Sequence, residues 1–209
     1  MNDPVDSTLA KKRSALVAAY LPGIYGTIGE NGPGIMLVER CDLNIVHIAG
    51  DATDQAFAHA VKTETGCPLP TEANTATVSS ECTVLWLAPD RWLVVSARHG
   101  EGLLKERFRM SLASGSAALT DVSNGHAVIQ ISGARVRELL AKGAPIDLHP
   151  SVFGPDQCAG TNLLQISVLL HCVETNVFHV YVARGFAQSL WEWLTEGAAE
   201  FGYRVDPTN

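Results

Sequence analysis

The sequence predicts an α+β fold made of two fused, similar β-α-β-β-α halves. Two observations indicate this fold. Strand-like apolar runs and amphipathic segments follow one another in the same order in both parts of the chain. The chain has 209 residues, 46% of them hydrophobic and 18% charged, so it can bury a large core. We expect one domain over residues 41–205, with halves of about 41–115 and 116–205, preceded by an extended arm over residues 1–40.

Glycine and proline interrupt the expected arm repeatedly, which excludes a long helix or strand there. Residues 35–38 form the most strand-like run within it. An arm of this kind is stable only where it lies on another surface, either its own domain or a partner.

The first half begins with a strand over residues 43–49. Thr53 or Asp54 can cap the following helix, which we expect to end near Thr65 because Gly66 comes next. Pro89 and Asp90 suit a tight turn between two further strands. These strands and the last helix of the half are expected over residues 83–87, 92–97 and 102–112.

The second half is expected to start at a β-hairpin centred on Asn124 and Gly125, because this pair tolerates the positive φ angles of a type I′ turn. The paired strands would be residues 118–122 and 127–132. A short helix follows, with Val136, Leu139 and Leu140 on one face. The remaining elements are expected at residues 163–172 and 177–183 for strands and 186–201 for a helix.

The hairpin would place Asp121, Ser123 and His126 together, and these are the residue types of a nucleophile, its base and an orienting acid. The alternative is a polar turn whose short side chains bond to the backbone. We favour the turn because the sequence lacks the G-x-S-x-G pattern of a strained nucleophile turn.

Other candidate groups lie in the second half. Asp147 and His149 could present an acid and an imidazole on a loop, but we favour the alternative, a capped turn with a surface histidine. His171 and His179 could face each other across two strands, but Cys172 would then point to the opposite face, which argues against a shared metal ion. Cys158 is expected to be a small buried side chain.

Composition excludes several classes of function. The formal net charge of −7 disfavours nucleic acid as a partner. The five cysteines are odd in number and widely spaced, which favours a reducing cytoplasmic location over a disulfide framework. No apolar run is long enough for a membrane span, and no phosphate-binding glycine motif occurs.

The order of several short motifs resembles the gamma subunit of heterotetrameric sarcosine oxidase. The resemblance covers about residues 35–201, and a more distant one extends to the fold of the folate-dependent aminomethyltransferases and their N-terminal domain. The motifs that carry it are Cys67-Pro68-Leu69-Pro70, residues 85–95 (LWLAPDRWLVV), Asp121-Val122-Ser123-Asn124-Gly125-His126, Ile131-Ser132-Gly133, Asp147-Leu148 and residues 189–194 (SLWEWL).

The resemblance implies a structural subunit without catalytic residues, cofactor or metal of its own. The partner subunits, chiefly a large alpha subunit, would hold FAD, FMN, NAD, zinc and tetrahydrofolate, and the complex would demethylate sarcosine oxidatively to glycine. Alternatives are the equivalent subunit of a related N-methyl amino acid dehydrogenase and a stand-alone folate-binding module. Residues that could contact a partner are Asp121, Ser123, His126, Asp147, His149, Trp191 and Trp193.

Overall fold

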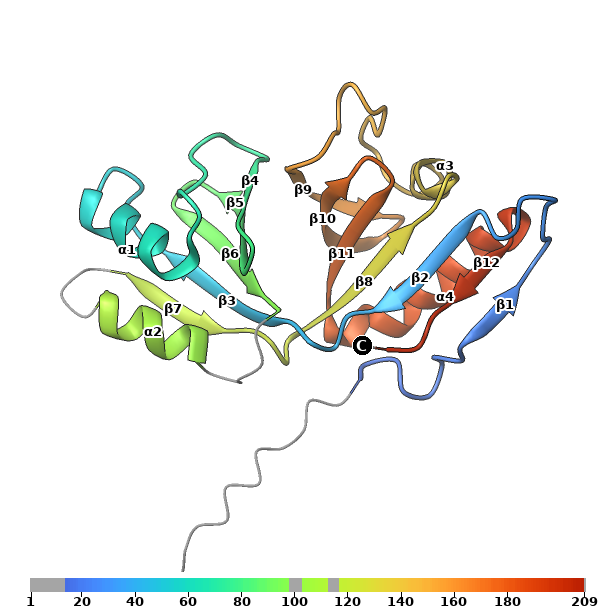
Figure 1. Ribbon diagram of the computed structural model, residues 1–209, viewed down its shortest axis with the longest axis horizontal. Coiled ribbons are helices and arrows are strands. Elements are labelled where there is room, and N and C mark those ends of the chain that lie inside the picture. Colours follow the sequence, from blue (N-terminus) through green and yellow to red (C-terminus); the bar gives the residue numbers. More distant parts are fainter. Residues whose placement is uncertain (1–13, 98–102, 113–116, 209) are drawn as a thin grey trace, which may run out of the picture.

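The computed structural model describes residues 14–97, 103–112 and 117–208, and it confirms the α+β class. Two sheets face each other, and helices cover their outer faces (Figure 1). The five-stranded sheet has the order β4-β5-β6-β3-β7. Its strands are β3 (Asn44–Ala49), β4 (Ala76–Val78), β5 (Cys82–Ala88), β6 (Arg91–Ser96) and β7 (Ala118–Asp121).

The seven-stranded sheet has the order β1-β12-β2-β8-β11-β10-β9. Neighbouring strands are antiparallel except β2 and β12, which are parallel. The strands are β1 (Gly23–Tyr25), β2 (Ile35–Glu39), β8 (His126–Ser132), β9 (Gln157–Leu163), β10 (Ile166–Glu174), β11 (Val177–Ala183) and β12 (Tyr203–Val205).

Two helices cover each sheet. The helices α1 (Gln55–Thr65) and α2 (Leu103–Ser111) cover the five-stranded sheet, and α3 (Val136–Ala141) and α4 (Ala187–Ala198) cover the seven-stranded one. The inner faces of the sheets meet through an inter-sheet cluster of buried side chains, so burial of apolar area holds the two halves together. Its members are Leu43, Ile45, Ala76, Leu85, Leu93, Val95, Val128, Cys158, Leu169 and Tyr181.

The helix α1 forms where the sequence predicts it. The Asp54 carboxylate caps its first turn by accepting from the Ala56 N–H at 2.8 Å. Gly66 ends the helix in the left-handed conformation, with φ of 72°. Phe57 on its buried face packs on Trp92, with ring centroids 5.6 Å apart.

The two halves repeat the same order of elements, with two strands more in each than in the β-α-β-β-α order that we predicted. Counted from β2, the chain runs β-β-α-β-β-β-α up to α2, and it repeats this order from β7 to α4. The first strand of each half pairs within the other half's sheet: β2 pairs with β8, and β7 pairs with β3. Because of this exchange, the chain crosses between the two sheets twice (Figure 1), and the crossings join the halves into one body.

The predicted hairpin at Asn124 and Gly125 is wrong, because its two strands lie in different sheets. The turn is closed by a bond from the Gly125 N–H to the Val122 carbonyl at 2.9 Å. Neither Asn124 nor Gly125 has the positive φ that a type I′ turn requires. The Val122 N–H donates to the Ile45 carbonyl, and the Ile45 N–H donates to the Ser123 hydroxyl. These two bonds hold the segment at the start of β3, so the chain leaves towards the second sheet.

The described part of the expected arm contributes to the seven-stranded sheet. The strand β2 is an inner strand between β8 and β12, and Leu16 is fully buried in the core beneath α4. The buried Glu39 carboxylate accepts from the Ser14 hydroxyl and from the Ala15 N–H at 3.1 Å. The segment from Ser14 is therefore part of the folded body, while the division of the chain at residue 40 stays a prediction.

Candidate functional site

The Asp121, Ser123 and His126 group binds backbone, as the turn hypothesis expects. Ser123 is buried, and its hydroxyl accepts from the Ile45 N–H at 2.9 Å. The Asp121 carboxylate accepts from the Ser123 N–H at 2.9 Å, and Nδ1 of His126 lies 3.3 Å from the Val122 carbonyl oxygen. Since the hydroxyl is bound to Ile45 and no hydrogen bond between Ser123 and His126 is present, these residues do not form an activated nucleophile.

The loop with Asp147 and His149 forms a capped turn at the surface. The Asp147 carboxylate accepts from the His149 N–H at 2.8 Å, and the His149 ring bonds to the Ser151 hydroxyl at 2.7 Å. Arg137 anchors this loop from below by donating to the Leu148 and Phe153 carbonyls at 2.5 and 2.9 Å. The capped-turn hypothesis for Asp147 is therefore confirmed.

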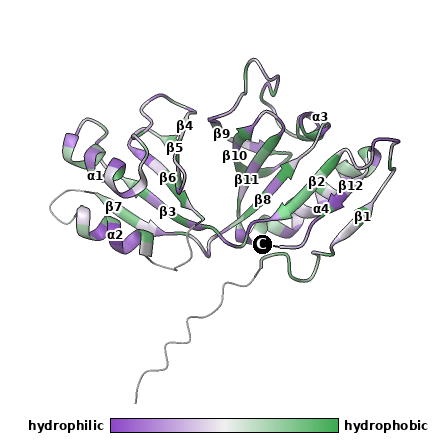
Figure 2. Ribbon diagram, in the orientation of Figure 1, coloured by the Kyte–Doolittle hydropathy of each residue, from purple (hydrophilic) through white to green (hydrophobic). Residues whose placement is uncertain are grey.

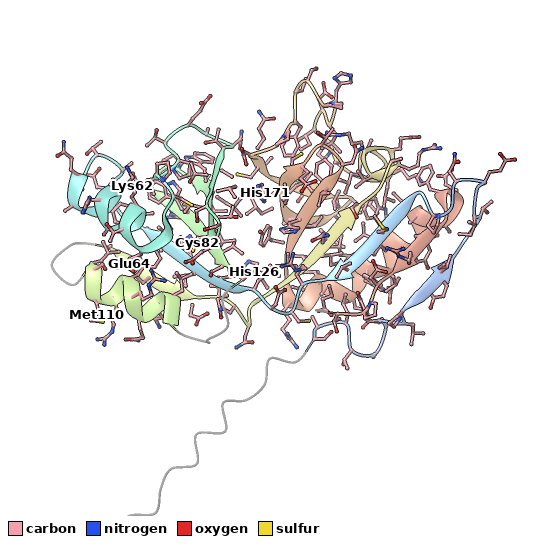
Figure 3. The ribbon with its side chains drawn as sticks, in the orientation of Figure 1. Lys62, Glu64, Cys82, Met110, His126 and His171 are labelled. Atoms are coloured by element: carbon pink, nitrogen blue, oxygen red, sulfur yellow. The ribbon has the colours of Figure 1, made fainter. Side chains whose placement is uncertain are left out.

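Two histidines lie next to each other on the inner face of the seven-stranded sheet (Figure 3 labels His171). His171 on β10 is opposite His179 on β11, with ring centroids 6.2 Å apart. Cys172 points to the other face, into the core beneath the helices, as strand alternation predicts. On the other side of His171, Cys158 of β9 donates through Sγ to the carbonyls of Thr75 and Trp86 at 3.3 and 3.4 Å.

Burial favours the uncharged forms of His171, His179 and Cys158 at neutral pH. His171 is 2% exposed, neither ring nitrogen has a hydrogen-bond partner, and burial lowers its pKa to about 4. Burial, His171 and Arg40 together lower the pKa of His179 to about 3. Burial raises the pKa of the Cys158 thiol to about 12, so this cysteine is not a nucleophile at neutral pH.

A polar network that the sequence did not reveal borders the two histidines. Arg40 binds the Asp42 carboxylate through two contacts of 2.9 Å, and its Nη1 donates to the Gln130 side chain at 3.1 Å. The same Gln130 oxygen lies 3.2 Å from Nε2 of His179. Paired with Arg40, the Asp42 carboxyl keeps a lowered pKa despite its burial. The network links the crossover after β2 to the inner face of β8 and β11.

An apolar groove opens at the other end of the space between the sheets. Its volume is about 360 Å³. The sequence did not predict this groove, because residues from both sheets line it. His47 of β3 and His126 of β8 are the only two imidazoles among its lining residues. The pKa of His47 is lowered, chiefly by burial and to a smaller extent by the nearby Arg91 and His126. The other lining residues are Leu87, Leu93, Val122, Gly160, Ser167, Val168, Leu169, Tyr181 and Ala183.

Not all of the residues predicted to contact a partner are exposed on the surface of this chain. Ser123 and Trp191 are buried within the chain, and Trp193 is half-buried with its ring against Gly143. The Ser123 hydroxyl binds Ile45, and the role of Ser123 as a contact residue stays a prediction. Trp191 is 4% exposed and packs on Tyr20, so it is mainly a core residue.

The four other predicted contact residues, Asp121, His126, Asp147 and His149, are exposed or half-exposed. Their role in binding a partner, like that of Trp193, stays a prediction. Within the described ranges, no group of three His, Cys, Asp or Glu side chains is placed to hold a metal ion. No helix of the described chain is long and apolar enough to cross a membrane.

The chain matches the sarcosine oxidase gamma subunit family model over residues 49–200. The gamma subunit from Arthrobacter sp. is 32% identical over 74% of this chain and 73% of its own length. The gamma subunit from Corynebacterium sp. (strain U-96) is 30% identical over 94% of each chain.

Two solved structures resemble this fold. A chain of the heterotetrameric sarcosine oxidase from Corynebacterium sp. U-96 gives a TM-score of 0.76 at 25% identity, over 85% of this chain and 88% of that chain. The glycine cleavage system aminomethyltransferase T from Bartonella henselae gives a TM-score of 0.58 at 10% identity, over 88% of this chain and 55% of that chain, and so shares the fold. From the family match and these relatives, the chain belongs to the sarcosine oxidase gamma subunit family.

Proposed function

We propose that this chain is a structural, non-catalytic subunit of a flavin-dependent heterotetrameric sarcosine oxidase. The complex demethylates sarcosine to glycine, passes the methyl carbon to tetrahydrofolate or releases it as formaldehyde, and forms hydrogen peroxide. The observation that carries the proposal is the likeness to a chain of a heterotetrameric sarcosine oxidase over most of both chains.

The other subunits hold FAD, FMN, NAD, zinc and tetrahydrofolate in this proposal, and the large alpha subunit is the chief partner. The geometry supports a structural role, because Ser123, Asp121 and Asp147 accept hydrogen bonds from N–H groups of this chain's own backbone. The aminomethyltransferase likeness does not extend the proposal to folate binding by this chain, because at 10% identity it concerns the fold alone. We place the complex in the cytoplasm, in keeping with five irregularly spaced cysteines.

The experiment is co-expression with the other three subunits of such an oxidase, with a tag on one of them. We expect this chain to co-purify in a fixed ratio, and sarcosine-dependent hydrogen peroxide formation to belong to the complex. The purified chain alone should oxidise no sarcosine. A chain that stays unbound beside the assembled partners, or that oxidises sarcosine by itself, would contradict the proposal.

A further inference from the structure

An uncharged N-terminal stretch places an unusual amount of apolar surface along one edge of the molecule. Residues 14–29 contain no Asp, Glu, Lys or Arg. Of the nine large hydrophobic side chains that are exposed in the described chain, four lie here, and we call them the edge patch: Val17, Leu21, Ile24 and Ile28. In Figure 2 the segment before β1 is coloured mainly green and white, the colours of apolar and neutral residues.

The edge patch lies along the strand β1, whose outer edge can still pair with another strand. The strand β1 is the last strand of the seven-stranded sheet, where it pairs with β12, and no described strand pairs with its other side. Tyr25 points towards the helices and stacks on Tyr203, with centroids 5.2 Å apart. Because side chains alternate along a strand, Ile24 points to the opposite face, where it is 60% exposed.

A groove beside the edge patch can receive a side chain. Its volume is about 250 Å³, and it lies between the segment before β1, the helix α4 and the strand β12. Leu21 borders it, and Trp191, although nearly buried, contributes to its wall. Aromatic walls around a small pocket are typical of the places where a protein partner inserts an anchoring residue. The remaining lining residues are Ala19, Tyr25, Glu192, Thr195, Tyr203 and Val205.

The charges next to the groove indicate what kind of surface fits. The exposed Glu192 is the one charged residue that lines the groove, Glu30 ends the uncharged stretch, and the whole chain has a formal net charge of −7. A second copy of the chain is a poor occupant, because a two-fold contact would bring equal negative charges together. A different protein with an apolar centre and Lys or Arg at its rim matches both features.

We propose that the edge patch and its groove dock another subunit of the oxidase, which inserts an apolar side chain beside Leu21 and Trp191 and places basic side chains near Glu192. The inference rests on the proposed function, since it assigns the surface by which this chain joins the complex. Uncharged apolar surface at such a contact contributes affinity, while Glu192 at the groove speeds association with a basic partner.

The test uses the co-expressed complex and three variants of this chain. Leu21→Asp and Ile24→Asp place a charge in the edge patch, and Met110→Asp places one on α2, at the other end of the molecule (Figure 3). All three side chains are at least 60% exposed, so the variants should keep the melting temperature of the wild-type chain. A fourth variant, Glu192→Lys, reverses the charge at the groove.

We expect Leu21→Asp and Ile24→Asp to bind the partner subunits at least about tenfold more weakly than Met110→Asp and the wild type. Glu192→Lys should slow association, most clearly at low salt. Equal binding by the two edge variants and Met110→Asp would overturn the inference. It would also be overturned if the isolated chain formed a dimer that Leu21→Asp dissociates. Failure of the wild-type chain to bind any partner would instead count against the proposed function.

Discussion

Replacing His171 by leucine should make the protein more stable, and should make its stability less sensitive to acid. The imidazole is 2% exposed, and neither of its nitrogens has a partner. A buried polar group without a hydrogen bond costs about 1–3 kcal/mol, and a leucine of similar volume removes that cost. At pH 7.5 we therefore expect a free energy of unfolding about 1–2 kcal/mol higher for His171→Leu.

The pH dependence follows from the lowered pKa. The ordinary histidine pKa is 6.5, and burial lowers that of His171 to about 4, so between these values the unfolded chain binds the extra proton. Stability therefore falls as the pH falls from 6.5 towards 4. Between pH 7.5 and 5.5 the wild-type chain should lose on the order of 1 kcal/mol through this residue. His179, whose pKa is lowered to about 3, adds a loss of the same sign.

Urea unfolding of the dilute chain at pH 7.5 and 5.5, followed by tryptophan fluorescence, measures both effects. His149→Leu is the matched control, because it removes an exposed imidazole outside the space between the sheets. The reasoning is refuted if His171→Leu loses as much stability on acidification as the wild type. It is equally refuted if this variant is less stable than the wild type at pH 7.5, since the imidazole would then have a favourable contact in the fold.

Three further changes test the contacts that hold the chain together, each by urea unfolding or by yield of folded protein. Arg137→Met should lower the free energy of unfolding by about 2–3 kcal/mol, since Arg137 donates to three backbone carbonyls; a loss under about 1 kcal/mol would contradict the anchoring role. Ser123→Ala should cost about 1–2 kcal/mol by freeing the buried Ile45 N–H, and wild-type stability would contradict that. Gly133→Ala should not fold, because Gly133 has a φ of 124° and a Cβ there would lie 2.2 Å from the Gly34 carbonyl oxygen; soluble, folded protein would show the close approach to be wrong.

Local chemistry made some elements predictable. The helix α1 has its cap, its apolar face and its terminating glycine all between Asp54 and Gly66, so this stretch of sequence contains all that determines it. The strand β11 was predicted at its observed bounds for a similar reason. The strand β9 was not predicted, and β10 was expected to begin at residue 163, because the turn between them uses Leu164 at a φ of 53° and contains neither glycine nor asparagine.

Long-range pairing was not predictable from local pattern. Asn124 and Gly125 have the composition of a hairpin turn, yet contacts with Ile45, 78 residues away from Ser123, decide where the strands go. The exchange of β2 and β7 between the sheets likewise needs the whole fold. The groove between His47 and His126 and the bonds of Arg40 follow from that exchange, so no single stretch of sequence indicates them.

The central claim is that this chain supports an oxidase without taking part in its chemistry. The most direct test is the turnover number of the assembled complex when this chain carries both His126→Gln and His149→Gln, which remove the half-exposed and the exposed candidate imidazole. Turnover per assembled complex should stay within about twofold of wild type, because a side chain that touches no substrate leaves the transition state unchanged. A loss of more than about tenfold in a fully assembled complex would contradict the account and make this chain a catalytic subunit.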